Sequence, residues 1–151
     1  MYNETRRLVN ITAGRQFKLN HFFIGELIVK CPKCHSEMEA VKVEGGEVDR
    51  CVSCKGLWFD LLEEEKFISQ AKSIDTGDST IGAASNTIDR INCPICENTP
   101  MIRMVDSRQH HIWFESCPSC VGRFYDAGEF RDLSSHTLLD IIRDVFTPER
   151  T

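Results

Sequence analysis

Eight cysteines are the residues in this 151-residue chain whose type and spacing suggest chemistry. They form two quartets, each built from two Cys-x2-Cys pairs: Cys31, Cys34, Cys51 and Cys54, then Cys93, Cys96, Cys117 and Cys120. Four thiolates complete a tetrahedral zinc site, and one Cys-x2-Cys loop can aim two of them at the same ion. The spacers of 16 and 20 residues between the pairs fit the usual zinc pattern of roughly 15–20 residues. We therefore expect two structural zinc ions per chain.

Three other uses of paired cysteines are less favoured. A rubredoxin-like iron site takes the same four sulfurs, so iron stays open as the less favoured metal. Disulfides belong to oxidising compartments, and the N-terminal residues do not show the basic stretch, apolar core and cleavage site of a signal peptide. A redox Cys-x2-Cys centre needs a βαβ context that this sequence does not indicate. We expect a reducing, cytoplasmic setting and zinc.

The two quartets lie in a repeated stretch of sequence. Cys31-Pro32-Lys33-Cys34 corresponds to Cys93-Pro94-Ile95-Cys96, and residues 54–60 correspond to residues 120–126 at a constant offset of 66. The second copy is four residues longer between its cysteine pairs. Units of about 40 residues bury little apolar surface on their own, so metal binding would supply much of their folding free energy.

The elements that must position the cysteines follow from local patterns. Gly45-Gly46 predicts a tight turn between strands at 40–44 and 47–49, and the second copy predicts strands at 101–105 and 111–115. Asp60 with Glu63, and Asp126 with Glu129, have the spacing of capping boxes before helices. A C-terminal helix over 137–146 would carry a wide apolar face: Leu138, Leu139, Ile142, Val145 and Phe146.

The expected fold is a small metal-stabilised α+β protein with tandem zinc ribbons, each a short antiparallel hairpin or sheet followed by a helix, and a C-terminal amphipathic helix. Residues 73–86 are rich in Ser, Thr, Gly and Asp, which is typical of a flexible tether. The segments that we expect are an N-terminal segment (1–30), ribbon 1 with its helix (31–72), a flexible linker (73–90), ribbon 2 (91–132), and a C-terminal helix and tail (133–151).

The motif set resembles a family of small bacterial zinc ribbons, the TFIIB-type transcription-factor zinc finger. The resemblance rests on Cys-Pro-x-Cys, on Val48-Asp49-Arg50-Cys51 through Asp60, and on the later run from Phe124 to Phe130, and it covers residues 31–68 and 93–133. It implies two knuckles, a short antiparallel sheet and a helix in each copy, with the eight cysteines as ligands. The position after the first knuckle, often Gly in relatives, is His35 here and Glu97 in the second copy.

The second hairpin contains the candidate partner surface. Strand alternation predicts that Ile112 and Phe114 face the core. His111 and Trp113 then lie on the other face, near Arg103 and Arg108. An exposed Trp beside Arg is typical of a binding hot spot. The plainer interpretation, which we prefer, is that Trp113 packs on the N-terminal segment or on the other copy.

Closed four-cysteine sites have no open coordination position, and the sequence shows no Ser/His/Asp set, phosphate loop or dinucleotide fingerprint, so we expect no enzymatic activity. The net charge of −5 disfavours generic binding to a phosphate backbone. We expect a protein-interaction or adaptor module. A nucleic-acid-binding or transcription-associated role is the alternative, favoured by the resemblance and by the basic residues among 1–30. Membrane insertion is not expected, and a homodimer through the C-terminal helix stays open.

Overall fold

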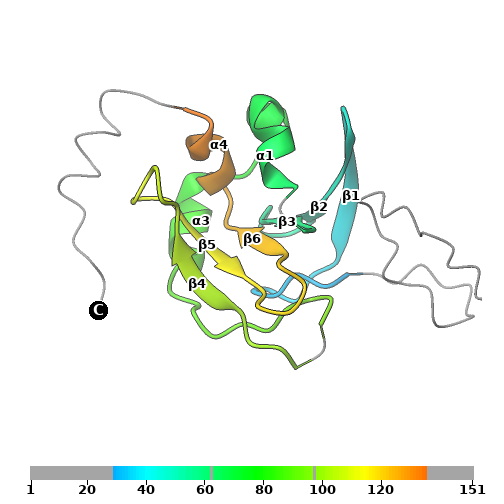
Figure 1. The fold of residues 1–151 in the computed structure, drawn as a ribbon, viewed down its shortest axis with the longest axis vertical. Helices are drawn as coiled ribbons and strands as arrows, with labels where there is room; N and C mark the ends of the chain where they lie inside the picture. The colour runs from blue at the N-terminus through cyan, green and yellow to red at the C-terminus, as the bar shows by residue number, and fades with distance from the viewer. Residues whose placement is uncertain (1–28, 62, 97, 136–151) are drawn as a thin grey trace, which may run out of the picture.

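A computed structural model describes residues 29–61, 63–96 and 98–135 of the chain. Two groups of three short strands are each followed by helical structure (Figure 1). The strands are β1 (Met38–Val43), β2 (Gly46–Cys51), β3 (Leu57–Phe59), β4 (Ile102–Val105), β5 (Trp113–Ser116) and β6 (Arg123–Tyr125). The predicted hairpin turn is confirmed, since β1 and β2 meet around Gly45, which adopts a φ of 89°. Such a φ favours glycine because it has no Cβ.

The six strands form one antiparallel sheet in the order β1-β2-β3-β6-β5-β4. We call residues 29–74 unit 1 and residues 91–135 unit 2, and the two units join where β3 pairs with β6. In this pairing Trp58 lies opposite Phe124, its own counterpart at the 66-residue offset. The register therefore places equivalent positions of the two units opposite each other, and it joins their strands into one continuous sheet.

Each face of the sheet has its own apolar core. One core combines side chains from both units under the helices and includes Leu57, Phe59, Tyr125 and Phe130. The second core, on the opposite face, surrounds Trp58 and Phe124 and includes cysteines of both quartets. The alternation of side chains along a strand produces this division. Both cores are shared between the units, so neither unit buries its apolar surface alone.

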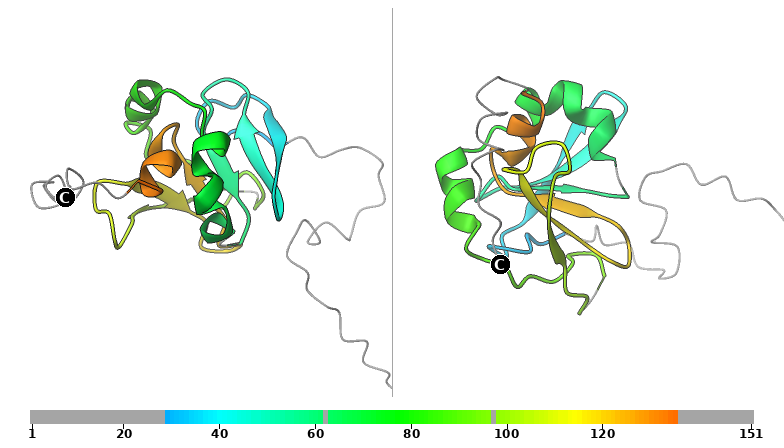
Figure 2. Two further views of the ribbon diagram at one scale, coloured as in Figure 1. Left: turned by 90° about the horizontal axis from the view of Figure 1, so that it is seen from above. Right: turned by 60° about the vertical axis from the view of Figure 1, so that its left-hand side comes forward.

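The helices are short. They are α1 (Glu64–Phe67), the 3₁₀ turn η2 (Ile68–Gln70), α2 (Ala71–Ile74), α3 (Ser79–Ser85) and α4 (Glu129–Leu133). Figures 1 and 2 show α1 and α4 together on one side of the sheet, with α3 apart from them.

The predicted capping boxes are wrong. Neither α1 nor α4 has a side-chain cap from its own N-cap residue, and Asp60 instead accepts the indole N–H of Trp58 at 2.8 Å. Asp126 is likewise engaged elsewhere, with Lys33.

The prediction of a flexible linker over residues 73–90 is also wrong, because this segment is folded and partly buried. It contains the end of α2 and all of α3. Asp75 is fully buried, and its carboxylate accepts the backbone N–H groups of Gly128 at 2.9 Å and Arg131 at 3.0 Å. A Cβ on Gly82 would lie 2.0 Å from the carbonyl oxygen of Ala127. The small and polar residues of this segment are typical of a tether, but here they allow its backbone to pack closely against neighbouring residues.

Two predicted elements lie outside the described residues: the N-terminal segment up to residue 28 and the C-terminal helix at 137–146. Among the residues that the structure does describe, no helix has the length and apolar character needed to cross a membrane.

Candidate metal centres

The first quartet gathers its four sulfur atoms at one point. All four Sγ atoms lie within 4.8 Å of one another. Cys31 and Cys54 are 3.7 Å apart at sulfur, and Cys34 and Cys51 are 3.3 Å apart. A tetrahedral zinc ion with Zn–S bonds near 2.3 Å would separate its sulfurs by about 3.8 Å, whereas a disulfide needs about 2.05 Å. The spacing therefore fits a metal site and no disulfide.

The second quartet has the same geometry. Its four Sγ atoms also lie within 4.8 Å of one another, and Cys93 and Cys120 are 3.7 Å apart. The structure therefore brings together all eight predicted ligands as two four-cysteine groups, each of which could hold a metal ion. In both groups the first cysteine of each pair is buried and the second is more exposed. Soft thiolate sets of this kind suit zinc or iron.

Backbone N–H groups support sulfurs of the cysteine loops. Cys51 accepts N–H groups of Ser53 and Cys54, each at 3.4 Å. Cys93 accepts those of Ile95 and Cys96 at 3.4 and 3.2 Å, and Cys117 accepts those of Ser119 and Cys120 at 3.4 and 3.5 Å. These dipoles favour the thiolate form that a metal requires.

The protonation of the thiols depends on their neighbours. A hydrogen bond from Cys31 lowers the pKa of Cys54 to about 5. Burial raises the pKa of Cys51 to about 11, and it does the same for Cys93. Without a cation, some members of each group therefore keep their protons at neutral pH. A divalent ion would displace these protons, so metal affinity should fall as the pH is lowered.

Each metal group packs against the other unit. Trp58 of unit 1 is 1% exposed, and a Cβ on Gly122 of unit 2 would lie 2.2 Å from its Cζ2 atom. Conversely, a Cβ on Gly56 would lie 2.4 Å from Cζ of Phe124. Each glycine comes two positions after the second cysteine of a pair. Because it has no side chain, it leaves room for the aromatic ring of the other unit.

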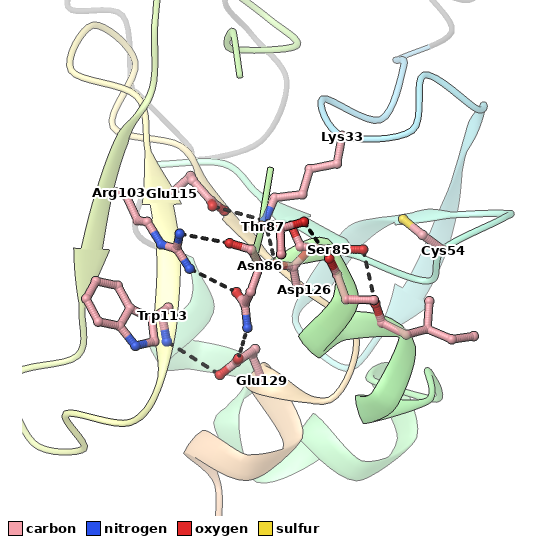
Figure 3. A network of polar contacts seen from close by, with 12 residues as sticks. Lys33, Cys54, Ser85, Asn86, Thr87, Arg103, Trp113, Glu115, Asp126 and Glu129 are labelled. Atoms are coloured by element: carbon pink, nitrogen blue, oxygen red, sulfur yellow. Dashed lines mark hydrogen bonds and ion pairs between the residues drawn. The ribbon is translucent and has the colours of Figure 1, made fainter. Parts of the chain in front are cut away.

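A buried ion cluster also links the units (Figure 3). The Lys33 side chain is 1% exposed, and its Nζ lies 2.5 Å from Asp126 Oδ2 and 3.0 Å from Glu115 Oε1. The same Nζ donates to the carbonyl of Ser85 at the end of α3. Lys33 belongs to the first cysteine loop, and both carboxylates belong to unit 2. Burial raises the pKa of both Asp126 and Glu115, and Lys33 opposes that shift.

The four residues of the candidate partner surface are not all neighbours. The guanidinium of Arg103 lies 4.9 Å from the ring of Trp113 and donates to the carbonyl of Asn86 at 2.8 Å (Figure 3). Trp113 and His111 are half-buried. Arg108 lines a pocket on the opposite sheet face, together with Phe114. Among the described residues, Trp113 therefore packs against Arg103 of its own hairpin.

Several residues that organise the structure were not identified from the sequence, among them Lys33, Asp75 and Asn86. A signal for Lys33 was available, because its counterpart in the second copy is Ile95. An apolar residue replaced by a lysine inside a repeated motif indicates a contact that only one copy makes. Asp75 and Asn86 lie outside the repeated motif, so comparing the copies does not reveal them.

One family model, described as a transcription factor zinc-finger of the TFIIB zinc-ribbon type, matches residues 30–70. The match covers the first four-cysteine group and supports a zinc ribbon there. The second four-cysteine group is geometrically similar but lies outside the matched range. Comparison with curated proteins and with solved structures gives no match.

Proposed function

We propose that the chain is a non-enzymatic, cytoplasmic protein-interaction module whose fold depends on two structural zinc ions. Four cysteines would complete each coordination sphere, so neither site would keep a position for water or substrate. The eight cysteines would hold the metal, and the metal would supply rigidity and folding free energy. Zinc is preferred to iron because the ribbon match at residues 30–70 is to a zinc family.

The observation that carries the preference for a protein partner is the state of the basic side chains. Lys33, Arg123 and Arg131 are engaged with Asp126, Glu64 and the backbone carbonyl of Asp75, respectively. Arg50 pairs with Glu39, and Arg103 is bound to Asn86. Non-specific nucleic-acid binding needs lysines and arginines that can replace counterions along a phosphate backbone. Here the five cations named above are engaged in contacts within the fold. A four-thiolate zinc site also keeps a net negative charge, which would repel phosphates.

The alternative is a nucleic-acid-binding or transcription-associated role. It is favoured by the family description matched at residues 30–70 and by the basic residues Arg6, Arg7, Arg15 and Lys18.

Fluorescence anisotropy separates the two roles. Zinc-loaded full chain is titrated into labelled single-stranded and double-stranded DNA and RNA at low and at physiological salt. We expect no salt-dependent binding. Binding that weakens steeply with salt would overturn the proposal in favour of the nucleic-acid role. In that case, replacing Arg6 and Arg7 by Gln should lower the affinity, whereas Lys42→Gln on the exposed β1 strand should not.

A further inference from the structure

A pocket of about 400 Å³ opens beside the β4–β5 hairpin, on the sheet face that carries α1 and α4. Phe114, Arg123 and Tyr125 line it from the sheet, Glu64 from α1 and Leu133 from α4. Met104, on the edge strand β4, lies at its rim. The volume lies within the range of small-ligand sites, about 300–1,000 Å³.

Three buried polar atoms of residues that line this pocket lack hydrogen-bond partners among the described residues: Oε2 of Glu64, Nε of Arg123 and the hydroxyl of Tyr125. Glu64 is 2% exposed and Tyr125 is fully buried. The other carboxylate oxygen of Glu64 pairs with Arg123. Buried polar atoms without partners are energetically costly, so a ligand that pairs with them would gain binding free energy. Burial raises the pKa of Glu64 and of Tyr125, as expected for groups that lack solvation.

The corresponding place in the other half of the molecule is closed and apolar. At the 66-residue offset, Arg123 corresponds to Leu57, Tyr125 to Phe59, and Leu133 to Phe67, while Glu64 corresponds to Phe130. These four apolar residues are all buried together in one core. The ring of Phe59 lies 4.5 Å from that of Phe130 and 6.4 Å from that of Phe67. The pocket therefore results from four coordinated differences between two related packing sites: three residues become polar and one becomes smaller.

The pocket adjoins a sheet edge that has little protection. On β4, Ile102, Met104 and Val105 are 54%, 43% and 38% exposed. Its one charged residue, Arg103, is turned toward Asn86. The opposite edge strand, β1, carries exposed Glu39 and Lys42, the kind of charge that keeps an edge from pairing with another strand. Only one edge of the described sheet is thus apolar and uncharged at its surface.

We propose that this pocket and the β4 edge together bind an extended peptide segment of a partner protein, with an uncharged amide group seated between Glu64, Arg123 and Tyr125. The proposal deepens the protein-binding role proposed above and rests on it. An amide carbonyl would accept from Arg123 Nε and from the Tyr125 hydroxyl, and its N–H would donate to Glu64 Oε2. An apolar side chain of the peptide would contact Met104 and Leu133, and its backbone would extend the sheet at β4.

The charges of the pocket favour a neutral group over an ion. Among the charged lining residues, Glu64 pairs with Arg123 and Asp106 with Arg108, and Glu65 is exposed to solvent. An incoming carboxylate would face Glu64, and an incoming ammonium would face Arg123. Either ion would also lose its hydration on entering. An amide has an acceptor and a donor side by side and carries no net charge.

Three related probes test this chemistry: N-acetylleucinamide, which is neutral, N-acetylleucine, an anion, and leucinamide, a cation. Each is titrated into zinc-loaded full chain while the backbone NMR signals of Met104, Phe114 and Tyr125 and the methyl signal of Met104 are followed. We expect the neutral amide to shift these signals with a dissociation constant of about 1 mM, as suits a probe of this size. The two ions should bind at least about tenfold more weakly.

Two substitutions locate the binding. Tyr125→Phe removes one hydroxyl and restores the residue type found at Phe59, so the fold should persist while amide affinity falls about three- to tenfold. Ile102→Glu places a charge on β4 at the position that corresponds to Glu39 on β1. This substitution should weaken the binding of a longer blocked peptide, acetyl-Val-Leu-Val-amide. Glu39→Gln is the matched control and should leave the binding of that peptide unchanged.

Three outcomes would overturn the proposal. One is the absence of shifts at millimolar amide in protein whose spectrum is folded, which would mean that the pocket holds water only. The second is equal binding of the ions and the amide. The third is shifts that Tyr125→Phe leaves unchanged. If any of these outcomes is found and nucleic acid also fails to bind, the protein-interaction role remains but this peptide site is wrong. Salt-dependent nucleic-acid binding would instead contradict the protein-interaction role.

Discussion

The residue after the second cysteine of a loop has a left-handed backbone conformation in three of the four cysteine pairs. His35, Lys55 and Val121 have φ values of 60°, 61° and 61°. In the remaining pair the described residue with this conformation is Asn98, at 54° and one position later. A β-branched residue is the least suited of these, because its Cβ crowds the backbone in this region. Val121 is therefore a locally strained residue.

Replacing Val121 by Gly should stabilise the zinc-loaded protein by about 1 kcal/mol, because the left-handed strain disappears. Denaturant unfolding at fixed zinc concentration measures the change. Val52→Gly is the matched control, since Val52 is similarly exposed and is not among the residues with positive φ. It should be neutral or destabilising. An equal gain from both substitutions would show that relief of strain is not the cause.

Which residues could be predicted depended on how local their role is. The eight cysteines were identified because their spacing alone carries the chemistry. Burial of Ile112 and Phe114 followed from strand alternation. Lys33, Glu64 and Arg123 were not identified, because their partners are 59 or more residues away in the sequence. Contacts of this kind exist only once the two units share a sheet.

At the scale of elements, the short segment after α2 holds α4 in place. The carboxylate of Asp75 accepts N–H groups at the start of α4, as an N-cap residue would, although it lies 53 residues before Gly128. A five-residue helix has too few internal hydrogen bonds to persist alone. Its stability depends on this cap and on burial of Phe130 and Leu133.

Asp75→Ala should therefore destabilise the protein by about 2–3 kcal/mol, since it leaves buried N–H groups without acceptors. Thermal unfolding of zinc-loaded protein reports the change. Asp78→Ala is the control: Asp78 caps α3 at the surface through Thr80, and its loss should destabilise the protein clearly less than the loss of Asp75. Similar effects from both substitutions would contradict a special role for Asp75.

The contact between each aromatic ring and the other unit's glycine offers a second test. Gly122→Ala should destabilise by about 1–3 kcal/mol because its new methyl group overlaps Trp58. Trp58→Phe makes space, so the two changes together should cost less than their sum by about 1 kcal/mol. Phe59→Leu, on the opposite sheet face, should show no such coupling with Gly122→Ala. Strict additivity in both pairs would contradict the packing described here.

At the scale of the whole molecule, the two units are joined by the β3–β6 pairing and by the Lys33 cluster. Motifs and turn residues predicted the cysteine loops and the hairpin strands. The segment between the two units was predicted to be a tether, but in the structure it is folded and packs against unit 2. The reason is physical: the composition of residues 73–86 is low in apolar residues, and its contacts use glycine backbone and an aspartate. Hydrophobic periodicity does not report contacts of that type.

Lys33→Met should destabilise the protein by about 3 kcal/mol or more, because it leaves Asp126 and Glu115 buried without a cation. The control is Lys30→Met: Lys30 is in the same unit, and its pair with Glu37 is largely exposed. Surface pairs of this kind contribute little. Chemical denaturation of both variants at saturating zinc measures the difference. If Lys33→Met costs no more than Lys30→Met, the cluster does not hold the units together.

The central claim is that each four-cysteine group binds one metal ion. Native mass spectrometry of freshly purified, reduced full chain tests it most directly, together with Cys54→Ser and Cys120→Ser. The expected result is two zinc ions in the unaltered protein and one in each variant, since each substitution removes a ligand from a different group. Fewer than two ions in the unaltered protein, or an unchanged count in either variant, would contradict the account.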